Sequence, residues 1–200
     1  MSELIINGID GMISDAHVYD FAESIRASKY PMAVDLNKPT AEVTKMTKTL
    51  GSCGIGEGHD NFLNGIRVAF DLTFSNKAWV EMERYHFVDF VSSQSTMHRI
   101  TQFDVTAQTN EYVDTELLAI VARLIDEYNA DPTPERYLQV LYSVPSGFKL
   151  TARLTTNYRQ LKTIYYQRRN HRLPEWRTFC KWIEELPYFK EIVLKREANE

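Results

Sequence analysis

The chain has 200 residues, of which 44% are hydrophobic and 25% charged, with a formal net charge of −4. This composition is that of an ordinary globular protein of one domain, and the negative total argues against a surface that coats nucleic acid. No apolar run is long enough to cross a membrane, and the first residues lack the basic and apolar segments of a signal peptide. Only Cys53 and Cys180 are present, which excludes a disulfide framework or a zinc site and suggests a reducing cytoplasm.

The first half of the chain predicts two strands and up to three helices. Residues 3 to 9 are a short apolar run typical of an edge strand, and residues 15 to 27 have a loosely helical spacing. A helix is predicted over residues 40 to 50, with glycine directly after it. Residues 66 to 74 alternate apolar and polar, which is the clearest strand pattern in the chain. A serine cap then predicts a helix over residues 75 to about 90.

The second half predicts mainly helices. Amphipathic patterns cover residues 115 to 128 and 135 to 142, with Thr115 as the cap of the first. A second strand is expected over residues 148 to 155, followed by helices over residues 157 to 168 and 174 to 186. Because strands and helices mix without a regular βαβ alternation, the expected class is α+β. We predict a single domain over residues 1 to 200, with its core at about 50 to 186 and a charged, frayed tail from residue 195.

One segment concentrates positive charge. Between Thr151 and Lys181 there are eight basic side chains and one acid, which is a local balance of +7 in an acidic chain. Such a field suggests an anionic ligand. On a helix, Asn157 and Arg168 would share a face with an apolar middle, which suits a mixed pocket. The alternative interpretation is a solvated basic helix with an ordinary buried stripe.

Two polar loops could also bind a ligand. The segment GSCGIGEGHDNF, residues 51 to 62, is rich in glycine but matches neither a Walker loop nor a dinucleotide fingerprint. The segment SSQSTMHR, residues 92 to 99, has hydroxyls, an amide, a histidine and an arginine that can bind phosphate or carbonyl oxygens. Both are equally compatible with ordinary loops. No nucleophile–base motif accompanies them, so the residues point to a nucleotide or a phosphorylated cofactor.

Three separated segments together resemble the flavin-dependent thymidylate synthase family. The first is GHDNFLN, in which His59 matches the family's Gly-His-x-Ser/Thr-x-x-Glu, Asn61 stands at the hydroxyl and Asn64 at the acid. The second begins at Arg84, 25 positions after His59, where the family has the motif RHRxxSxNExSxRY. Here it reads RYHFVDFVSSQSTMHRI, so it is degenerate, and its polar second half is recovered only with about two extra residues.

The third segment opens the basic helix. The family has Asn-x-Arg and then an arginine eleven residues after the asparagine, and Asn157, Arg159 and Arg168 stand at those positions. Thr163 replaces a second family asparagine, and His171 and Trp176 loosely resemble the His-Ala-Gln-Trp-Glu that follows in the family. Order and spacing, more than any one motif, carry the resemblance over about residues 50 to 185.

The resemblance implies a mixed sheet flanked by helices in a homotetramer with sites between subunits. It implies FAD as cofactor, with NADPH and methylenetetrahydrofolate as co-substrates, and methylation of dUMP at C5. The flavin would carry the hydride chemistry while the protein supplies orientation and charge. Arg168 would be the catalytic residue, binding the pyrimidine ring and stabilising the negative charge that develops on it.

The resemblance also assigns the remaining site residues. Those expected at the flavin are His59, Asn61, Arg84, His86, Asn157 and Arg159. Those expected at the nucleotide, besides Arg168, are Glu81, Ser95, Thr96, His98 and Arg99.

The degenerate second motif leaves two alternatives open. His86 replaces a permanently charged arginine of the family, so the chain could be a catalytically inactive synthase-like protein that binds a nucleotide or a protein partner. The basic segment could instead bind single-stranded nucleic acid through Tyr165, Tyr166 and Trp176, although the acidic total disfavours this.

Overall fold

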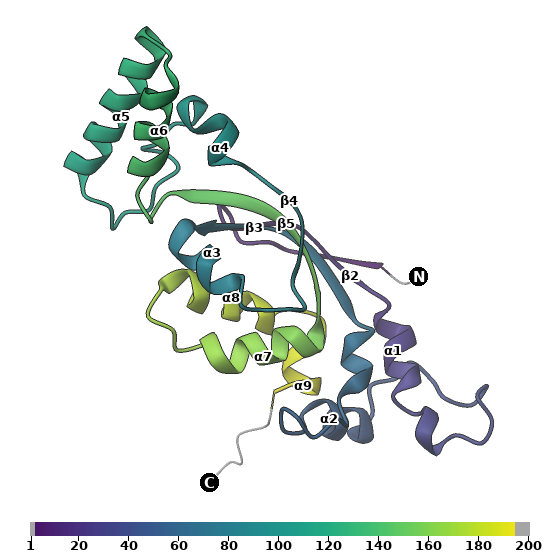
Figure 1. The fold of residues 1–200 in the computed structure, drawn as a ribbon. Coiled ribbons are helices and arrows are strands. Elements are labelled where there is room, and N and C mark those ends of the chain that lie inside the picture. Colours follow the sequence, from purple (N-terminus) through teal and green to yellow (C-terminus); the bar gives the residue numbers. More distant parts are fainter. Residues whose placement is uncertain (1–2, 195–200) are drawn as a thin grey trace.

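A computed structural model describes residues 3–194, and its centre is a five-stranded sheet (Figure 1). The strand order is β1-β2-β3-β5-β4, and every pairing among these strands is antiparallel. Helices flank the sheet, so the predicted α+β class is confirmed. The charged tail predicted from residue 195 lies outside the described residues.

The elements are bounded as follows. The strands are β1 (Glu3–Ile6), β2 (Ile13–Tyr19), β3 (Arg67–Ser75), β4 (Asp89–Ser93) and β5 (Lys149–Asn157). The α-helices are α1 (Phe21–Ala27), α2 (Lys45–Gly51), α3 (Asn76–Met82), α4 (Thr96–Arg99), α5 (Thr115–Ala130), α6 (Pro134–Ser143), α7 (Tyr158–Arg168), α8 (Pro174–Glu184) and α9 (Phe189–Ile192). Short 3-10 helices are η1 (Tyr30–Met32), η2 (Asn61–Asn64) and η3 (Ile100–Gln102). Within the described range, no helix has the length and apolar character needed to cross a membrane.

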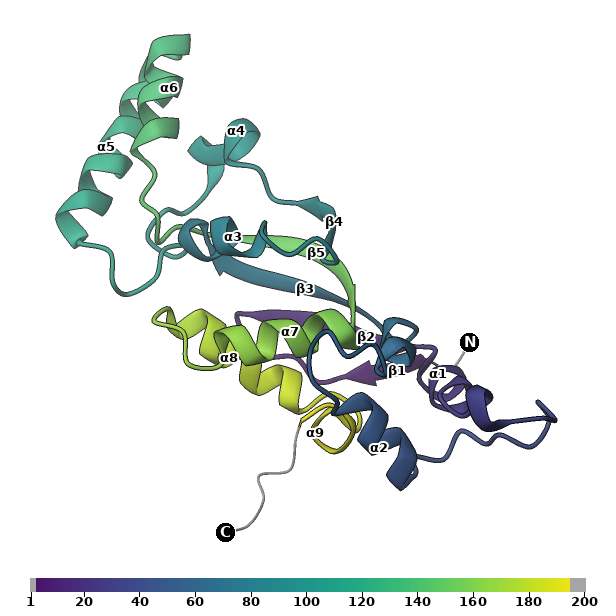
Figure 2. The same ribbon diagram turned by 60° about the horizontal axis from the view of Figure 1, so that its bottom comes forward.

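The main core lies between the sheet and helices α7 and α8, which run side by side along one face (Figure 2). Alternate residues of β3 face these helices and are fully buried. Phe70 packs on Trp182 with ring centroids 5.0 Å apart, and Phe74 packs on Trp176 at 5.1 Å. The strand predicted over residues 66 to 74 is therefore confirmed. Its apolar and polar residues alternate because successive side chains of a strand point to opposite faces of the sheet.

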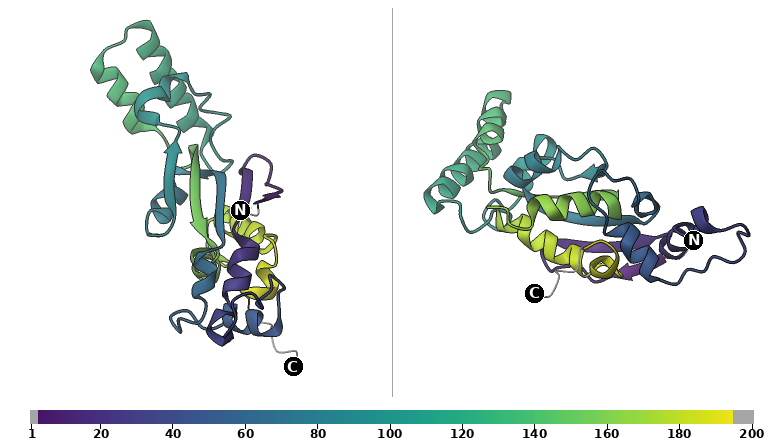
Figure 3. Two further views of the ribbon diagram at one scale, coloured as in Figure 1. Left: turned by 90° about the vertical axis from the view of Figure 1, so that its right-hand side faces the viewer. Right: turned by 90° about the horizontal axis from the view of Figure 1, so that it is seen from below.

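Helices α5 and α6 form a hairpin that projects from one end of the sheet (Figure 3). A second, smaller core lies at its base, around Val121, Val140 and Phe148. Asp114, rather than the predicted Thr115, caps α5 by accepting a 2.7 Å hydrogen bond from the backbone of Glu116. Val121 of α5 is fully buried, the other residues that pack on this core, Leu118, Leu124 and Ile125, are partly buried, and Leu117 is exposed.

The helix predicted over residues 75 to about 90 is wrong in its second half. Ser75 does cap α3, but the helix ends at Met82, and residues 89–93 form the edge strand β4 paired with β5. Trp79 of α3 and Phe90 of β4 contact each other, with ring centroids 5.2 Å apart. They meet because the chain turns after α3 and β4 runs back past that helix. Residues 89–93 pair with β5 through backbone hydrogen bonds between strands instead of continuing the helix.

Two further predictions are corrected at the N-terminal side. Residues 15 to 27 are not one helical segment, because β2 occupies residues 13–19 and α1 starts at Phe21. The helix predicted from residue 40 begins at Lys45, where Thr44 accepts a hydrogen bond from Thr47 N and forms a capping box. Both β1 and β2 belong to the sheet, which therefore extends upstream of the predicted core at residue 50.

Candidate functional site

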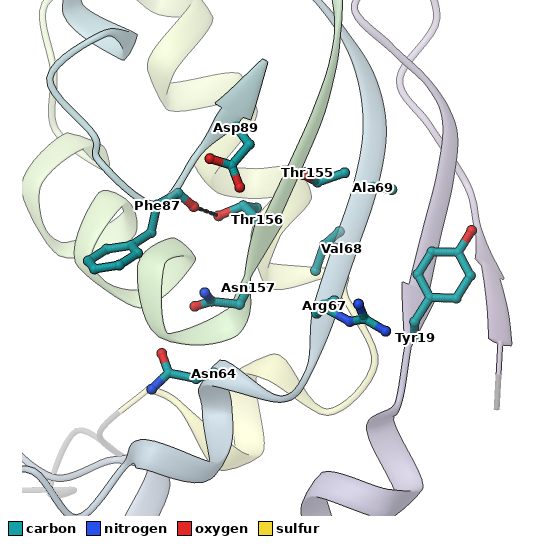
Figure 4. A pocket seen from close by; sticks show the side chains of 10 residues that line it. All are labelled: Tyr19, Asn64, Arg67, Val68, Ala69, Phe87, Asp89, Thr155, Thr156 and Asn157. Carbon is teal, nitrogen blue, oxygen red and sulfur yellow. Dashed lines mark hydrogen bonds between the residues drawn. The ribbon is translucent and has the colours of Figure 1, made fainter. Parts of the chain in front are cut away.

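Two adjoining cavities open where β5 runs into α7. The sheet-end cavity, of about 470 Å³, lies at the ends of β2, β3, β4 and β5 and includes Arg67 and Asp89 (Figure 4). The loop cavity, of about 550 Å³, lies between α7 and the glycine loop of residues 51–60. Asn64, Phe87 and Asn157 line both cavities and form their shared wall.

Asn157 is held at this wall by two local constraints. It is the last residue of β5, paired with Arg67 of β3, and it is also the N-cap of α7. Its Oδ1 accepts a 2.9 Å hydrogen bond from the backbone N–H of Gln160. The cap uses the oxygen, so the carboxamide nitrogen is the group available to a ligand. The strand-to-helix transition thus fixes one predicted site residue where both cavities meet.

A buried ion cluster supports the loop cavity from beneath. The Lys162 ammonium is fully buried and donates to Asp60 Oδ2 at 2.6 Å and to the carbonyls of Gly51 and Cys53 at 2.9 and 2.7 Å. All three of its donors are therefore used. Arg159 approaches Asp60 from the cavity side, with Nε 3.1 Å from Oδ1. That contact lacks hydrogen-bond geometry, so Oδ1 is buried and held by charge alone.

The cluster leaves Arg159 available at the cavity. Its side chain remains 35% exposed and lines the loop cavity, while Asp60 is 3% exposed. Asp60 offsets one of two positive charges, so the group of three has a balance of +1. Such a site suits an anionic ligand, and a guanidinium is the better fit for a phosphate.

Arg168 lies at the other end of α7, in a separate cluster. Its Nε donates to Tyr85 Oη at 2.7 Å, and Nη1 is 3.1 Å from a carboxylate oxygen of Glu81. The guanidinium also lies over the rings of Tyr85 and Trp176, at 5.5 and 5.0 Å from their centroids. Only 11% of the side chain is exposed. Its hydrogen-bonding and stacking capacity is therefore largely used inside the protein.

Burial and the charge of Arg168 together set the pKa values in this cluster. Partial burial acts to raise the pKa of Glu81, but the Arg168 hydrogen bond and the charges of Arg84 and Arg168 lower it overall. Burial raises the pKa of Tyr85, against the lowering effect of Arg168. Burial, and then the Arg168 charge, lower the pKa of His171. The cluster thus favours an ionised Glu81, a neutral phenol and a neutral imidazole.

The other predicted flavin residues are at the surface. His59 and Asn61 flank the buried Asp60 but are themselves exposed, and His86 is exposed beside the shared wall. Arg84 is 70% exposed and pairs with Glu81 at 3.2 Å, one helical turn away. The glycine loop turns through Gly56 and Gly58, both with positive φ, so the loop needs glycine there.

The predicted nucleotide residues at 95–99 lie far from the two cavities within one chain. Gln94 N donates to Thr151 O, six residues before Asn157 along β5. At about 3.3 Å per strand residue this puts the segment roughly 20 Å from the cavities. Ser95 precedes α4 at its N-cap position without a side-chain capping hydrogen bond, and Thr96, His98 and Arg99 belong to the helix. Tyr137 of the hairpin donates a 2.9 Å hydrogen bond to Met97 O, which anchors α4 at that end.

Asn157 and Arg168 are also separated, because the eleven residues of α7 span about 16 Å at 1.5 Å each. One chain therefore brings Asn157 and Arg159 together, and separately Glu81, Arg84 and Arg168, but does not gather all predicted residues into one cavity.

Sequence reasoning assigned no role in the site to Asp60, Lys162, Asn64 and Phe87, although all but Lys162 lie within the first two segments. A signal for Lys162 was present, since helical spacing puts it beside Leu161 and between the buried Tyr158 and Tyr165. A lysine on an apolar stripe needs a buried acceptor. Asp60, next to the predicted His59, supplies it from a loop 102 residues earlier. No comparable signal marked Phe87.

No family model matches the chain, and no curated protein matches it. Among solved structures, the chain is similar to the flavin-dependent thymidylate synthase of Helicobacter pylori complexed with FAD and dUMP. The TM-score is 0.62 at 15% identity, over 98% of this chain and 100% of the other. A second structure of that organism's thymidylate synthase X with FAD and dUMP gives a TM-score of 0.61 at 15% identity, over 92% and 96%. The chain therefore has the fold of flavin-dependent thymidylate synthases, as the sequence resemblance implied.

Proposed function

We propose that this protein is a flavin-dependent enzyme that transfers a one-carbon unit to C5 of a pyrimidine deoxynucleoside monophosphate, with dUMP to dTMP as the reaction. The observation that carries the proposal is the pairing of a full-length fold likeness with a cavity pair built on Asn157 and Arg159. The sequence resemblance predicts both residues at the flavin. Both line the loop cavity, which supports a ligand site there.

The donor set fits FAD. The loop cavity offers a free carboxamide nitrogen at Asn157, a partly exposed guanidinium at Arg159, and the buried Asp60 Oδ1, which has no hydrogen-bond donor. These groups match a heteroaromatic ring with amide-like edges and a phosphate. When bound, FAD supplies the hydride chemistry, with NADPH as reductant and methylenetetrahydrofolate as one-carbon donor.

In the proposed site, the chain's own residues bind and orient. Asn157 and Arg159 hold the cofactor, with His59, Asn61, Arg84 and His86 at its rim. Arg168 and Glu81 meet the pyrimidine, with Ser95, Thr96, His98 and Arg99 at the nucleotide. Since one chain keeps these groups about 16–20 Å apart, we propose a homotetramer in which neighbouring copies complete each site. A cytoplasmic location remains a prediction from the two unpaired cysteines.

A second candidate is a catalytically inactive synthase-like protein that binds a nucleotide or a protein partner. The enclosure of Arg168 between Glu81, Tyr85 and Trp176 favours it, because a guanidinium already saturated by the protein has little left for a substrate. The enzyme proposal requires Arg168 to exchange at least one of these contacts for the pyrimidine.

The test is a visible absorption spectrum of freshly purified protein, repeated after adding FAD and desalting. We expect a retained flavin band, and formation of dTMP from dUMP when NADPH and methylenetetrahydrofolate are added. Arg159→Gln should reduce flavin retention, whereas Arg123→Gln, on the projecting α5, should not. A folded protein that retains no flavin, oxidises no NADPH and still binds dUMP would favour the inactive candidate.

A further inference from the structure

The wall shared by the two cavities carries an exposed phenyl ring. Phe87 is 68% exposed and lines both cavities. Figure 4 shows its ring standing near the carboxamide of Asn157, above Asn64. The backbone beneath the ring is fixed, because Phe87 O accepts a 2.7 Å hydrogen bond from the Thr156 hydroxyl and the next residue, Val88, is buried. The ring is thus held at the surface on a rigid base.

Its place in both cavities distinguishes this ring from other exposed aromatic side chains. Phe90 is 46% exposed but packs on Trp79 at 5.2 Å, and Tyr188 is 53% exposed but stacks on Phe21 at 5.5 Å. Tyr112 and Tyr142 are more exposed than Phe87, at 71% and 83%, but neither lines the two cavities. A phenyl face left in water loses the hydrophobic and stacking free energy that a planar partner would supply. Its position therefore favours a flat ligand laid against it.

The groups around the ring specify what kind of flat ligand. Asn64 presents a carboxamide at this wall, which pairs a donor with an acceptor in one plane, and Asn157 adds its free carboxamide nitrogen. This matches the edge of a heteroaromatic ring that carries N–H and C=O groups. On the loop-cavity side of the wall, Arg159 supplies a partly exposed cation for a phosphate.

We infer that Phe87 is a specificity-determining residue, which stacks on the heteroaromatic ring of a phosphorylated ligand and selects ring-bearing phosphates over phosphates without a ring. The inference rests on the proposed function for its choice of FAD and dUMP as ligands. It extends that function by assigning ring selection to Phe87, which lies in the second sequence segment at a position that the family motif leaves unspecified. The free energy of stacking a base on an aromatic side chain changes binding affinity about 5- to 150-fold.

The experiment compares calorimetric binding of FAD, dUMP and ribose 5-phosphate to four full-length proteins. These are the unsubstituted chain, Phe87→Leu, Phe87→Tyr, and Tyr142→Leu as a control for loss of an exposed ring on α6, away from the cavities. We expect Phe87→Leu to weaken FAD or dUMP binding about 5- to 150-fold, while Phe87→Tyr and Tyr142→Leu keep it. Ribose 5-phosphate should bind the unsubstituted protein and Phe87→Leu equally.

The outcomes separate this inference from the proposed function. If FAD and dUMP each bind the unsubstituted protein and Phe87→Leu equally, the ring-selection inference fails while the flavin function stands. If FAD does not bind but dUMP binding depends on Phe87, the inference stands and the flavin function fails. If neither FAD nor dUMP binds the folded, unsubstituted protein, both fail. Because Phe87 is exposed, circular dichroism should show all four proteins equally folded.

Discussion

Replacing Lys162 with methionine tests whether the buried cluster holds the loop cavity together. Lys162→Met keeps a long unbranched side chain but removes the ammonium, which is fully buried and donates to Gly51 O, Cys53 O and Asp60 Oδ2. The substitution leaves two carbonyl oxygens and one carboxylate oxygen without their donor. The Asp60 carboxylate would then have only Arg159 as its charge partner.

The expected loss of stability follows from the buried groups that Lys162→Met leaves without a partner. Removing one partner of a buried ion pair costs about 3–5 kcal/mol, mostly because the remaining charge stays buried. Arg159 still offsets part of the Asp60 charge, which favours the lower end, about 3 kcal/mol. For a chain of this size, about 3–5 kcal/mol corresponds to a fall in Tm of roughly 6–20 °C. Since total stabilities are about 5–15 kcal/mol, this is a large fraction.

The assay is urea and thermal unfolding followed by circular dichroism. The matched control is Lys181→Met, which makes the same chemical change at an exposed position of α8 and should alter stability by less than about 0.5 kcal/mol. A Lys162→Met protein whose free energy of unfolding lies within about 1 kcal/mol of the unsubstituted protein would refute the reasoning. It would mean that Asp60 or the glycine loop relaxes to water at little cost.

Two further predictions concern single hydrogen-bonded groups. Tyr85→Phe removes the hydroxyl that accepts a hydrogen bond from Arg168 Nε and donates one to Gln167 Oε1. In a denaturation assay it should lower the free energy of unfolding by about 1.5–3 kcal/mol. No measurable loss would show that the cluster rearranges. His17 hydrogen-bonds Asp15 and Glu3, and the Asp15 bond, against partial burial, raises its pKa above 6.5. Because the folded-state pKa is the higher one, the stabilisation is complete below pH 6.5 and is lost as pH rises through the folded pKa. An NMR titration should give a midpoint above 6.5 that falls in Asp15→Asn, and a midpoint at or below 6.5 in the unsubstituted protein contradicts the contact.

The sequence determined the elements whose signal is local. The alternation of β3, the boundary between β5 and α7 at Asn157, and the helices of the second half follow from side-chain periodicity and from caps. These patterns arise within one element, so no knowledge of its neighbours is needed. The same is true of the spacing that singled out Asn157 and Arg159, since both lie within three residues of one helix start.

Only the tertiary structure decided what depends on distant partners. Residues 89–93 form a strand because β5, some 60 residues later, offers an open edge, although the local pattern also suited a helix. Lys162 and Asp60 are buried together because a loop and a helix 102 residues apart meet, and each would otherwise be a buried charge without a partner. The predicted helical face carries both Asn157 and Arg168, but the two side chains lie at separate sites. They are separated because a helix rises about 1.5 Å with each residue. Sequence spacing fixes which face a side chain occupies, but the packing of distant segments fixes what that side chain meets.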